Sequence, residues 1–211
     1  MSSAVSSKSQ SIASIVAQIP DETLMMSRMH VGSRAITSIV VKNDDGILTR
    51  LMLAHKHHFL DTKSIYLAFP LGIHSHLYDF TTSAMFGKIY YECWDRGKNK
   101  TDEFFYEYRF DGKTGDILPV SAHSPLALID EIKLTGKETT YKANHFHSFK
   151  VIGQQAAWVI NEHNRTQEEM TVFSWYPIPR NNLESRQFIG PEHVRRFVID
   201  FFNEAENDGL I

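Results

Sequence analysis

The chain has 211 residues, of which 42 % are hydrophobic and 22 % are charged, as in a globular protein with a sizeable core. Its net charge of −3 favours neither a nucleic acid nor an anionic membrane as a partner, and no apolar run is long enough to cross a bilayer. Cys93 is the only cysteine, which excludes an internal disulfide and suits a reducing compartment. We therefore expect one cytoplasmic domain that binds neither nucleic acid nor membrane.

The beginning of the chain predicts a tail and two short helices. Residues 1–10 are small and polar, so we expect them to be disordered and the domain to span 11–211. Apolar residues then recur at helical spacing over 12–19, and Pro20 ends that segment. Asp21 is suited to cap a second helix. We expect both helices to pack on the outside of a sheet.

The middle of the chain has the alternation of strands from about 35 to 178. The segments that predict strands are 36–41, 47–55, 65–69, 73–80, 83–94, 104–110, 126–134, 138–153, 156–163 and 169–178. Gly87 offers a turn that would reverse the chain. A last amphipathic helix is predicted over about 191–206, beginning at Pro191. Many short strands with helices only at the ends predict an all-β sandwich or barrel with peripheral helices.

Histidine is the residue type that stands out, with eleven in the chain. Three His-x-His pairs occur, where random placement would give about half a pair. The pairs are His55/His57, His74/His76 and His145/His147. Because residues i and i+2 of a strand share a face, each pair can present two imidazoles to one divalent metal. His58 breaks the alternation after the first pair, so we assign that group to a strand end or the surface.

The last pair lies in a longer pattern. Gly136, Lys142, Asn144 and His147 reproduce the spacing Gly-x5-Pro-x-Gly-x2-His, with lysine at the proline position and asparagine at the second glycine. Asparagine is, after glycine, the residue that best tolerates a positive φ, so it can hold the same turn.

The second pair opens an earlier pattern, in which His74 and His76 are followed by a strand-length run that ends at Gly87. In this order, and in an all-β chain, the two patterns resemble the two motifs of the cupin family. The resemblance covers about 35–178 and is carried by spacing rather than by identity. It implies a double-stranded β-helix, or jelly-roll, barrel.

The resemblance also implies a metal site. His74, His76 and His147 would bind one divalent ion, with His145 as the rival for the third position. Iron(II) is the favoured metal, and zinc, manganese or nickel are alternatives. A small organic substrate and a homodimer paired through sheet edges are the implied partners.

Two further side chains are candidates for catalysis. The fourth ligand of the family, usually glutamate, falls on Phe80; either a bulge turns Asp79 inward, or the site has three histidines, as in the thiol dioxygenase branch of the cupins. Arg50 lies on an early predicted strand, where it would either clamp a substrate carboxylate from inside or point outward into solvent.

The function implied by this resemblance is that of a mononuclear non-haem iron dioxygenase. A metal-dependent isomerase or lyase is a near alternative, in which the ion acts as a Lewis acid. A non-catalytic sensor or storage protein on the same barrel, or a structural jelly roll, are alternatives of other classes.

Overall fold

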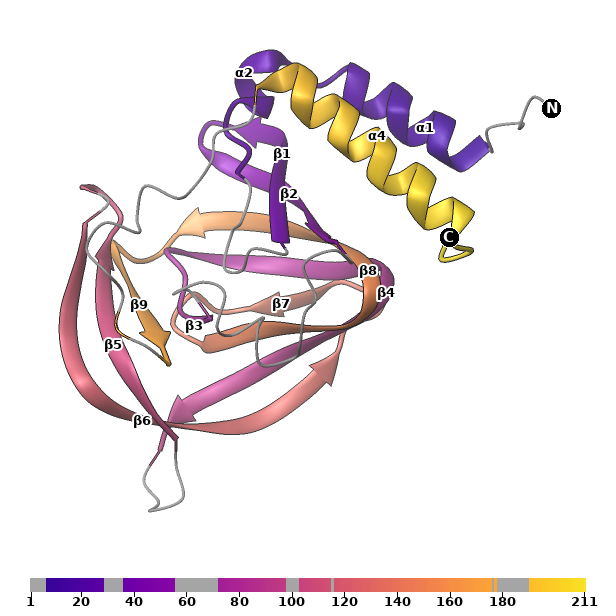
Figure 1. The fold of residues 1–211 in the computed structure, drawn as a ribbon. Coiled ribbons are helices and arrows are strands. Elements are labelled where there is room, and N and C mark those ends of the chain that lie inside the picture. The colour runs from indigo at the N-terminus through magenta and orange to yellow at the C-terminus, as the bar shows by residue number, and fades with distance from the viewer. Residues whose placement is uncertain are drawn as a thin grey trace.

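The computed structural model describes most of the chain, and Figure 1 draws the described part as a ribbon. The described residues are 7–28, 36–55, 72–97, 103–114, 116–175, 177 and 190–211. The strand predicted over 65–69 lies outside them, as do His57 and His58.

Strands make up most of the described fold. They are β1 (Ile36–Asp44), β2 (Ile47–Ala54), β3 (Ile73–His74), β4 (Tyr78–Arg96), β5 (Glu103–Asp111), β6 (Ile117–Lys133), β7 (Thr139–Tyr141), β8 (Phe146–Arg165) and β9 (Glu169–Ser174). All their pairings are antiparallel. This confirms the predicted fold class, an all-β protein with helices at its two ends.

The strand order shows how the sheet curls. β1 and β2, which match the predicted strands 36–41 and 47–55, form a hairpin, and β2 pairs onward with β8. From β8 the pairings run through β3, β9, β5 and β6 to β4, which pairs again with β8 along its length. Since β3 has only two residues, the sheet curves round an interior without a continuous wall (Figure 1). The arrangement is consistent with a jelly roll.

Gly87 has a different role from the expected one. It lies in the middle of β4 with φ +89°, and the register against β8 shifts between Phe86 and Lys88. A Cβ at this position would lie 2.6 Å from the Cβ of Ala156. The expected chain reversal is therefore wrong, because the glycine permits an irregularity and a close approach inside one long strand rather than a turn between two.

Three helices are described, namely α1 (Ser7–Ala17), α2 (Asp21–Leu24) and α4 (Pro191–Asn207). The start of α1 at Ser7 falls inside the stretch expected to be disordered. The expectation that Asp21 caps α2 is wrong, because the extended backbone of Pro20 occupies the cap and Asp21 is the first helical residue. Its carboxylate instead accepts a hydrogen bond from Arg195 of α4 at 2.6 Å. No helix in the described stretches is both long and apolar enough to span a membrane.

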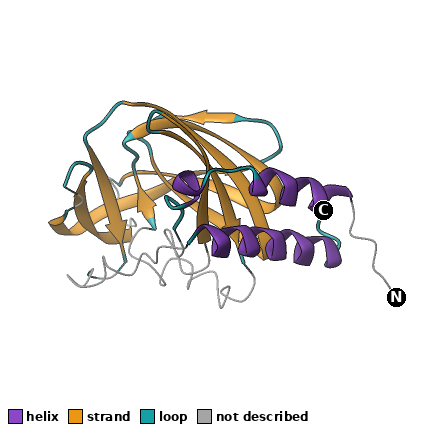
Figure 2. Ribbon diagram, turned by 90° about the horizontal axis from the view of Figure 1, so that it is seen from above, coloured by secondary structure: helices purple, strands orange, loops and turns teal. Residues whose placement is uncertain are grey.

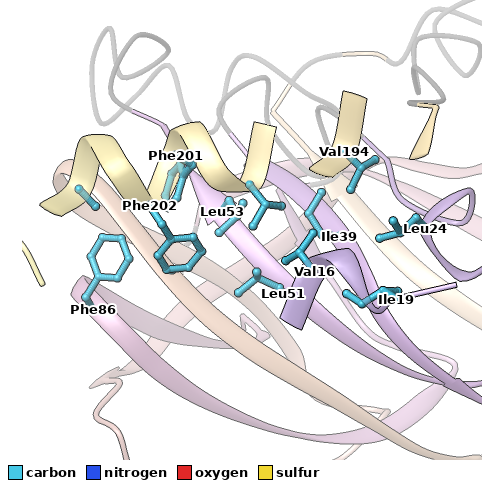
Figure 3. Close-up of a cluster of buried hydrophobic side chains, with 13 residues drawn as sticks. Val16, Ile19, Leu24, Ile39, Leu51, Leu53, Phe86, Val194, Phe201 and Phe202 are labelled. Atoms are coloured by element: carbon cyan, nitrogen blue, oxygen red, sulfur yellow. The ribbon is translucent and has the colours of Figure 1, made fainter. Parts of the chain in front are cut away.

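The helices cover one face of the sheet. Figure 2 shows the two long helices side by side against the strands. Their apolar sides meet β1 and β2 in a buried cluster (Figure 3) that includes Val16, Ile19, Leu24, Ile39, Leu51, Leu53, Val194, Phe201 and Phe202. The predicted packing of helices on the outside of a sheet is thus observed, which leaves the opposite face of these strands to line the interior.

Candidate metal centre

Two short stretches of backbone position the histidines. His74 ends β3 and lies directly opposite His147 of β8, so the two side chains share a face of the sheet. His76 follows β3, and its backbone N–H donates to the carbonyl of Ala143 at 2.7 Å. His76 lies outside the strand that His74 ends, but the rings of the two residues are only 4.9 Å apart. The structure therefore brings together all three histidines that the resemblance assigned to a metal.

The donor atoms have the spacing of a metal site. One ring nitrogen from each of His74, His76 and His147 lies within 4.8 Å of the others. The Nε2 atoms of His76 and His147 are 3.2 Å apart. Two nitrogens bound to one ion at about 2.1 Å lie about 3.0–3.4 Å apart as neighbours, and at most about 4.2 Å apart. The nitrogens of His76 and His147 fit a shared ion as they stand. The ring nitrogen of His74 has only to move slightly closer to them.

Burial controls the charge of the two inner imidazoles, those of His76 and His147. His147 is fully buried, His76 is nearly so, and His74 is partly exposed. Burial, followed by the neighbouring His147, His74 and Arg50, holds the pKa of His76 well below its usual value. Burial and then His74 lower the pKa of His147 strongly, while the backbone of His145 acts in the opposite direction. Both rings are therefore neutral at neutral pH, which is the form that binds metals.

Phe80 takes the place at which the family motif puts a carboxylate ligand. Its ring centroid lies 4.6 Å from that of His76 and 5.4 Å from that of His147, and the side chain is fully buried. Asp79 faces elsewhere: its carboxylate accepts bonds from the Lys142 ammonium at 2.7 Å and the Ala143 N–H at 2.8 Å. An inward-turned Asp79 is not what the structure shows, because successive residues of a strand point to opposite faces.

His145 does not join the cluster. It lies in the turn before β8, where its N–H donates to the carbonyl of Lys142 at 3.1 Å, and its side chain is exposed. The i and i+2 rule does not apply to it, since β8 begins only at Phe146. His55 is also elsewhere, with its Nε2 3.1 Å from a carboxylate oxygen of Glu204 on α4.

Arg50 points inward, so its solvent-facing alternative is wrong. Its Nε donates to Glu162 at 2.6 Å, and its Nη1 lies 3.4 Å from the Ser38 hydroxyl. The Glu162 side chain is 5 % exposed, and Tyr78 interacts with both charged groups. Burial opposes the charge on Arg50, but Tyr78 and Glu162 together hold its pKa above the usual value. The ring of Tyr78 lies 5.0 Å from that of His76, so this network adjoins the histidines.

Tyr78 and Glu162 were not singled out from the sequence. A signal for Glu162 existed, because Trp158, Ile160 and Glu162 alternate along one strand and the first two are apolar. That spacing places the glutamate on the same face as the core residues. No comparable signal identifies Tyr78, which is the first residue of β4 and follows an irregular stretch at 75–77.

The fold and this site define a class: a mainly antiparallel β protein whose interior holds three convergent imidazoles suited to a divalent metal. No family model matches the chain, and no curated protein matches it. Similar solved structures include hydroquinone 1,2-dioxygenase from Sphingomonas sp. TTNP3 with 4-hydroxybenzoate bound, at 13 % identity over 61 % of this chain and 66 % of its own, with a TM-score of 0.36.

Two more similar structures are hydroxypropylphosphonic acid epoxidase from S. wedmorenis and the polyketide cyclase RemF from Streptomyces resistomycificus. The epoxidase is 10 % identical over 70 % of this chain and 60 % of its own, with a TM-score of 0.39. The cyclase is 8 % identical over 78 % and 89 %, with a TM-score of 0.36. The chain thus spans less than two thirds of the length of the dioxygenase and the epoxidase. At these identities and TM-scores, the likeness assigns neither a family nor a reaction.

Proposed function

We propose that the protein is a metal-dependent enzyme in which His74, His76 and His147 bind one divalent ion. The observation that carries the proposal is the 3.2 Å separation between the Nε2 atoms of His76 and His147, with the third imidazole beside them in a buried, aromatic interior. Three neutral protein ligands leave coordination positions for other molecules, as in catalytic rather than structural metal sites.

Within this class, we propose iron(II) as the metal and a dioxygenase reaction on a small organic substrate. Imidazole donors suit iron, and iron(II) bound by three ligands supplies the redox chemistry that reactions with dioxygen require. Phe80 supports a three-ligand site, since its ring offers no donor where a carboxylate would complete a fourth position.

Arg50 is the proposed substrate-positioning group. One N–H of its guanidinium binds Glu162, and the contact of Nη1 with Ser38 is long. Tyr78 also hydrogen-bonds with this side chain, and the N–H groups that remain can donate to a carboxylate or another oxygen of the substrate. Glu162 and Tyr78 hold the guanidinium in place, while Phe80 and the neighbouring rings keep water away from the histidines.

The metal site is tested by the metal content of protein purified without a histidine tag. We expect about one equivalent of metal in the wild type and none in His76→Ala. His145→Ala is the matched control, since this exposed histidine stands beside the motif but outside the cluster, and it should keep the metal. Less than about a tenth of an equivalent in the wild type, after loading with iron, zinc, manganese and nickel in turn, would leave the non-catalytic binding protein as the function.

The reaction class is tested separately on iron-loaded protein. Substrate-dependent consumption of dioxygen, lost in His76→Ala, is the expected result. Turnover of a substrate without dioxygen consumption would support the isomerase or lyase alternative instead. The homodimer and the cytoplasmic location stay predictions, and size-exclusion chromatography with light scattering checks the first of them.

A further inference from the structure

His147 is the deepest of the three candidate ligands, and hydrogen bonding restrains its ring only weakly. Metal-binding histidines usually donate the N–H of their other ring nitrogen to a carboxylate, carbonyl or water, which fixes the ring. The Nδ1 of His147 is buried and makes no hydrogen bond of ordinary geometry to any residue that the structure describes, although the ring does interact with the backbone of His145. Contacts of another kind are therefore needed as well to hold this imidazole with its Nε2 towards His76.

Tyr91 supplies the closest parallel contact. Its ring centroid lies 4.7 Å from that of His147 and the two planes are 14° apart. The strand register explains the contact, because Tyr91 lies opposite Phe149 while His147 lies opposite Cys93, so that Tyr91 and His147 are diagonal neighbours on one face. Phe149 meets the His147 ring edge-on at 5.4 Å.

Tyr91 is itself held in place by a second stacked ring. The ring of Tyr141, on the edge strand β7, lies 3.6 Å from that of Tyr91 with the planes 18° apart. Near-parallel planes therefore continue from His76 through His147 and Tyr91 to Tyr141. A flat ring packed between others has few orientations open to it, whereas an aliphatic side chain would leave the imidazole free to tilt.

The hydroxyl groups of Tyr91 and Tyr141 do not contribute to orienting His147. Both the Tyr91 and the Tyr141 hydroxyls are buried without a hydrogen-bond partner among the described residues, which costs stability. Burial raises the pKa of Tyr91, and burial raises that of Tyr141 to about 12, so both phenols are neutral beside His147. Neither adds a charge to the site, and their rings are the parts in contact with it.

We propose that Tyr91, backed by Tyr141, is the positioning residue that holds the His147 imidazole ready for metal binding. This inference rests on the proposed metal site and adds the group that orients it. It predicts that a flat ring at position 91 matters for metal affinity and that the hydroxyl does not.

The test is a titration of metal-free protein with cobalt(II), followed by its visible absorption bands and by calorimetry. Tyr91→Phe should bind within about twofold of the wild type and melt at a temperature no lower. Tyr91→Leu and Tyr91→Met, which lack a flat ring, should bind about 10-fold to 100-fold more weakly, in the range found when groups that orient metal ligands are removed. Their cobalt bands should also shift. Methionine fills the space of a lost ring better than leucine, so one of the two variants should stay folded.

Phe105→Leu is the matched control, because it truncates an equally buried aromatic residue in a different cluster. It should lower the melting temperature as much as Tyr91→Leu without changing cobalt affinity. The inference is wrong if Tyr91→Met or Tyr91→Leu keeps wild-type affinity, or if Tyr91→Phe loses as much as they do. No cobalt binding by the wild type would instead overturn the proposed metal site, and this inference with it.

Discussion

The Nε2 atom of His76 lies 3.2 Å from that of His147, although the two residues are 71 positions apart in the chain. Two neutral imidazoles can meet in this way either through one shared proton or around one shared ion. The adjacent His74 makes the second arrangement the more useful one chemically, since three such donors suffice to hold a catalytic metal.

Metal binding should therefore stabilise the folded protein. A site that exists only in the native state gains about 2.7 kcal/mol when the ion is present at 100 times its dissociation constant. Thermal unfolding of chelator-treated protein, with and without added zinc, measures the gain as a rise in melting temperature. His147→Ala should abolish the rise and His145→Ala should retain it. An equal rise in both variants would place the binding elsewhere.

Phe80→Glu should convert the site to four ligands. Without metal, the carboxylate is buried against His76 and His147 in an apolar interior, so the variant should unfold at a lower temperature than the wild type. With metal, the carboxylate becomes a ligand, and affinity should rise by about tenfold or more, equivalent to about 1.4 kcal/mol. Phe80→Leu adds no donor and is the control. Unchanged affinity in Phe80→Glu would mean that position 80 does not face the ion.

Arg50 and Glu162 should show strong coupling in stability. Glu162→Ala leaves a largely buried guanidinium unpaired, which should cost about 3–5 kcal/mol in urea denaturation. Replacing both partners by Arg50→Met and Glu162→Leu should cost less than Glu162→Ala alone, because no charge is then left unpaired. A double variant that loses as much stability as Glu162→Ala, or more, would show that the two side chains do not depend on each other.

Glu107 should make stability depend on pH. Its carboxylate accepts two hydrogen bonds from Arg96, at 2.7 and 3.0 Å. These bonds lower the pKa of Glu107 below its ordinary value of 4.5, because their effect is larger than the opposing effect of burial. A carboxyl whose pKa is lower in the folded state stabilises the fold above its unfolded pKa and loses that effect as pH falls through the folded value. Wild type should therefore melt higher than Glu107→Gln at about pH 7, with the gap closing below about pH 4. A gap that stays constant over this range would remove the ion pair as its cause.

Gly87→Ala should be more damaging than Gly153→Ala. Both glycines have positive φ, +89° and +115°, so each substitution carries a backbone cost of about 1–2 kcal/mol. Only at Gly87 does the added Cβ also collide with Ala156, whereas nothing lies within 4 Å at Gly153. Chemical denaturation of the two variants compares the costs directly. Equal losses would mean that β4 can move away from β8 without penalty.

Local patterns were sufficient to predict the fold class. The hairpin of β1 and β2 follows from two alternating segments around Asn43 and Gly46, and α4 follows from apolar spacing after Pro191. The same rules interrupted β4 at 81–82 and expected a turn at Gly87, which is equally compatible with a turn and with a bulge. The distinction depends on the approach of Ala156, which lies on another strand and cannot be inferred from local spacing.

The sequence by itself determined that His74 and His76 would lie together, because residues two apart in extended chain need no distant partner to be neighbours. Only the tertiary structure decided that His147 rather than His145 meets them, that Phe80 rather than Asp79 faces them, and that Glu162 pairs with Arg50. Each of these choices depends on the residue at which a strand begins or on which strand lies alongside it. A shift of one residue turns a side chain to the opposite face, and contacts between distant segments fix that register.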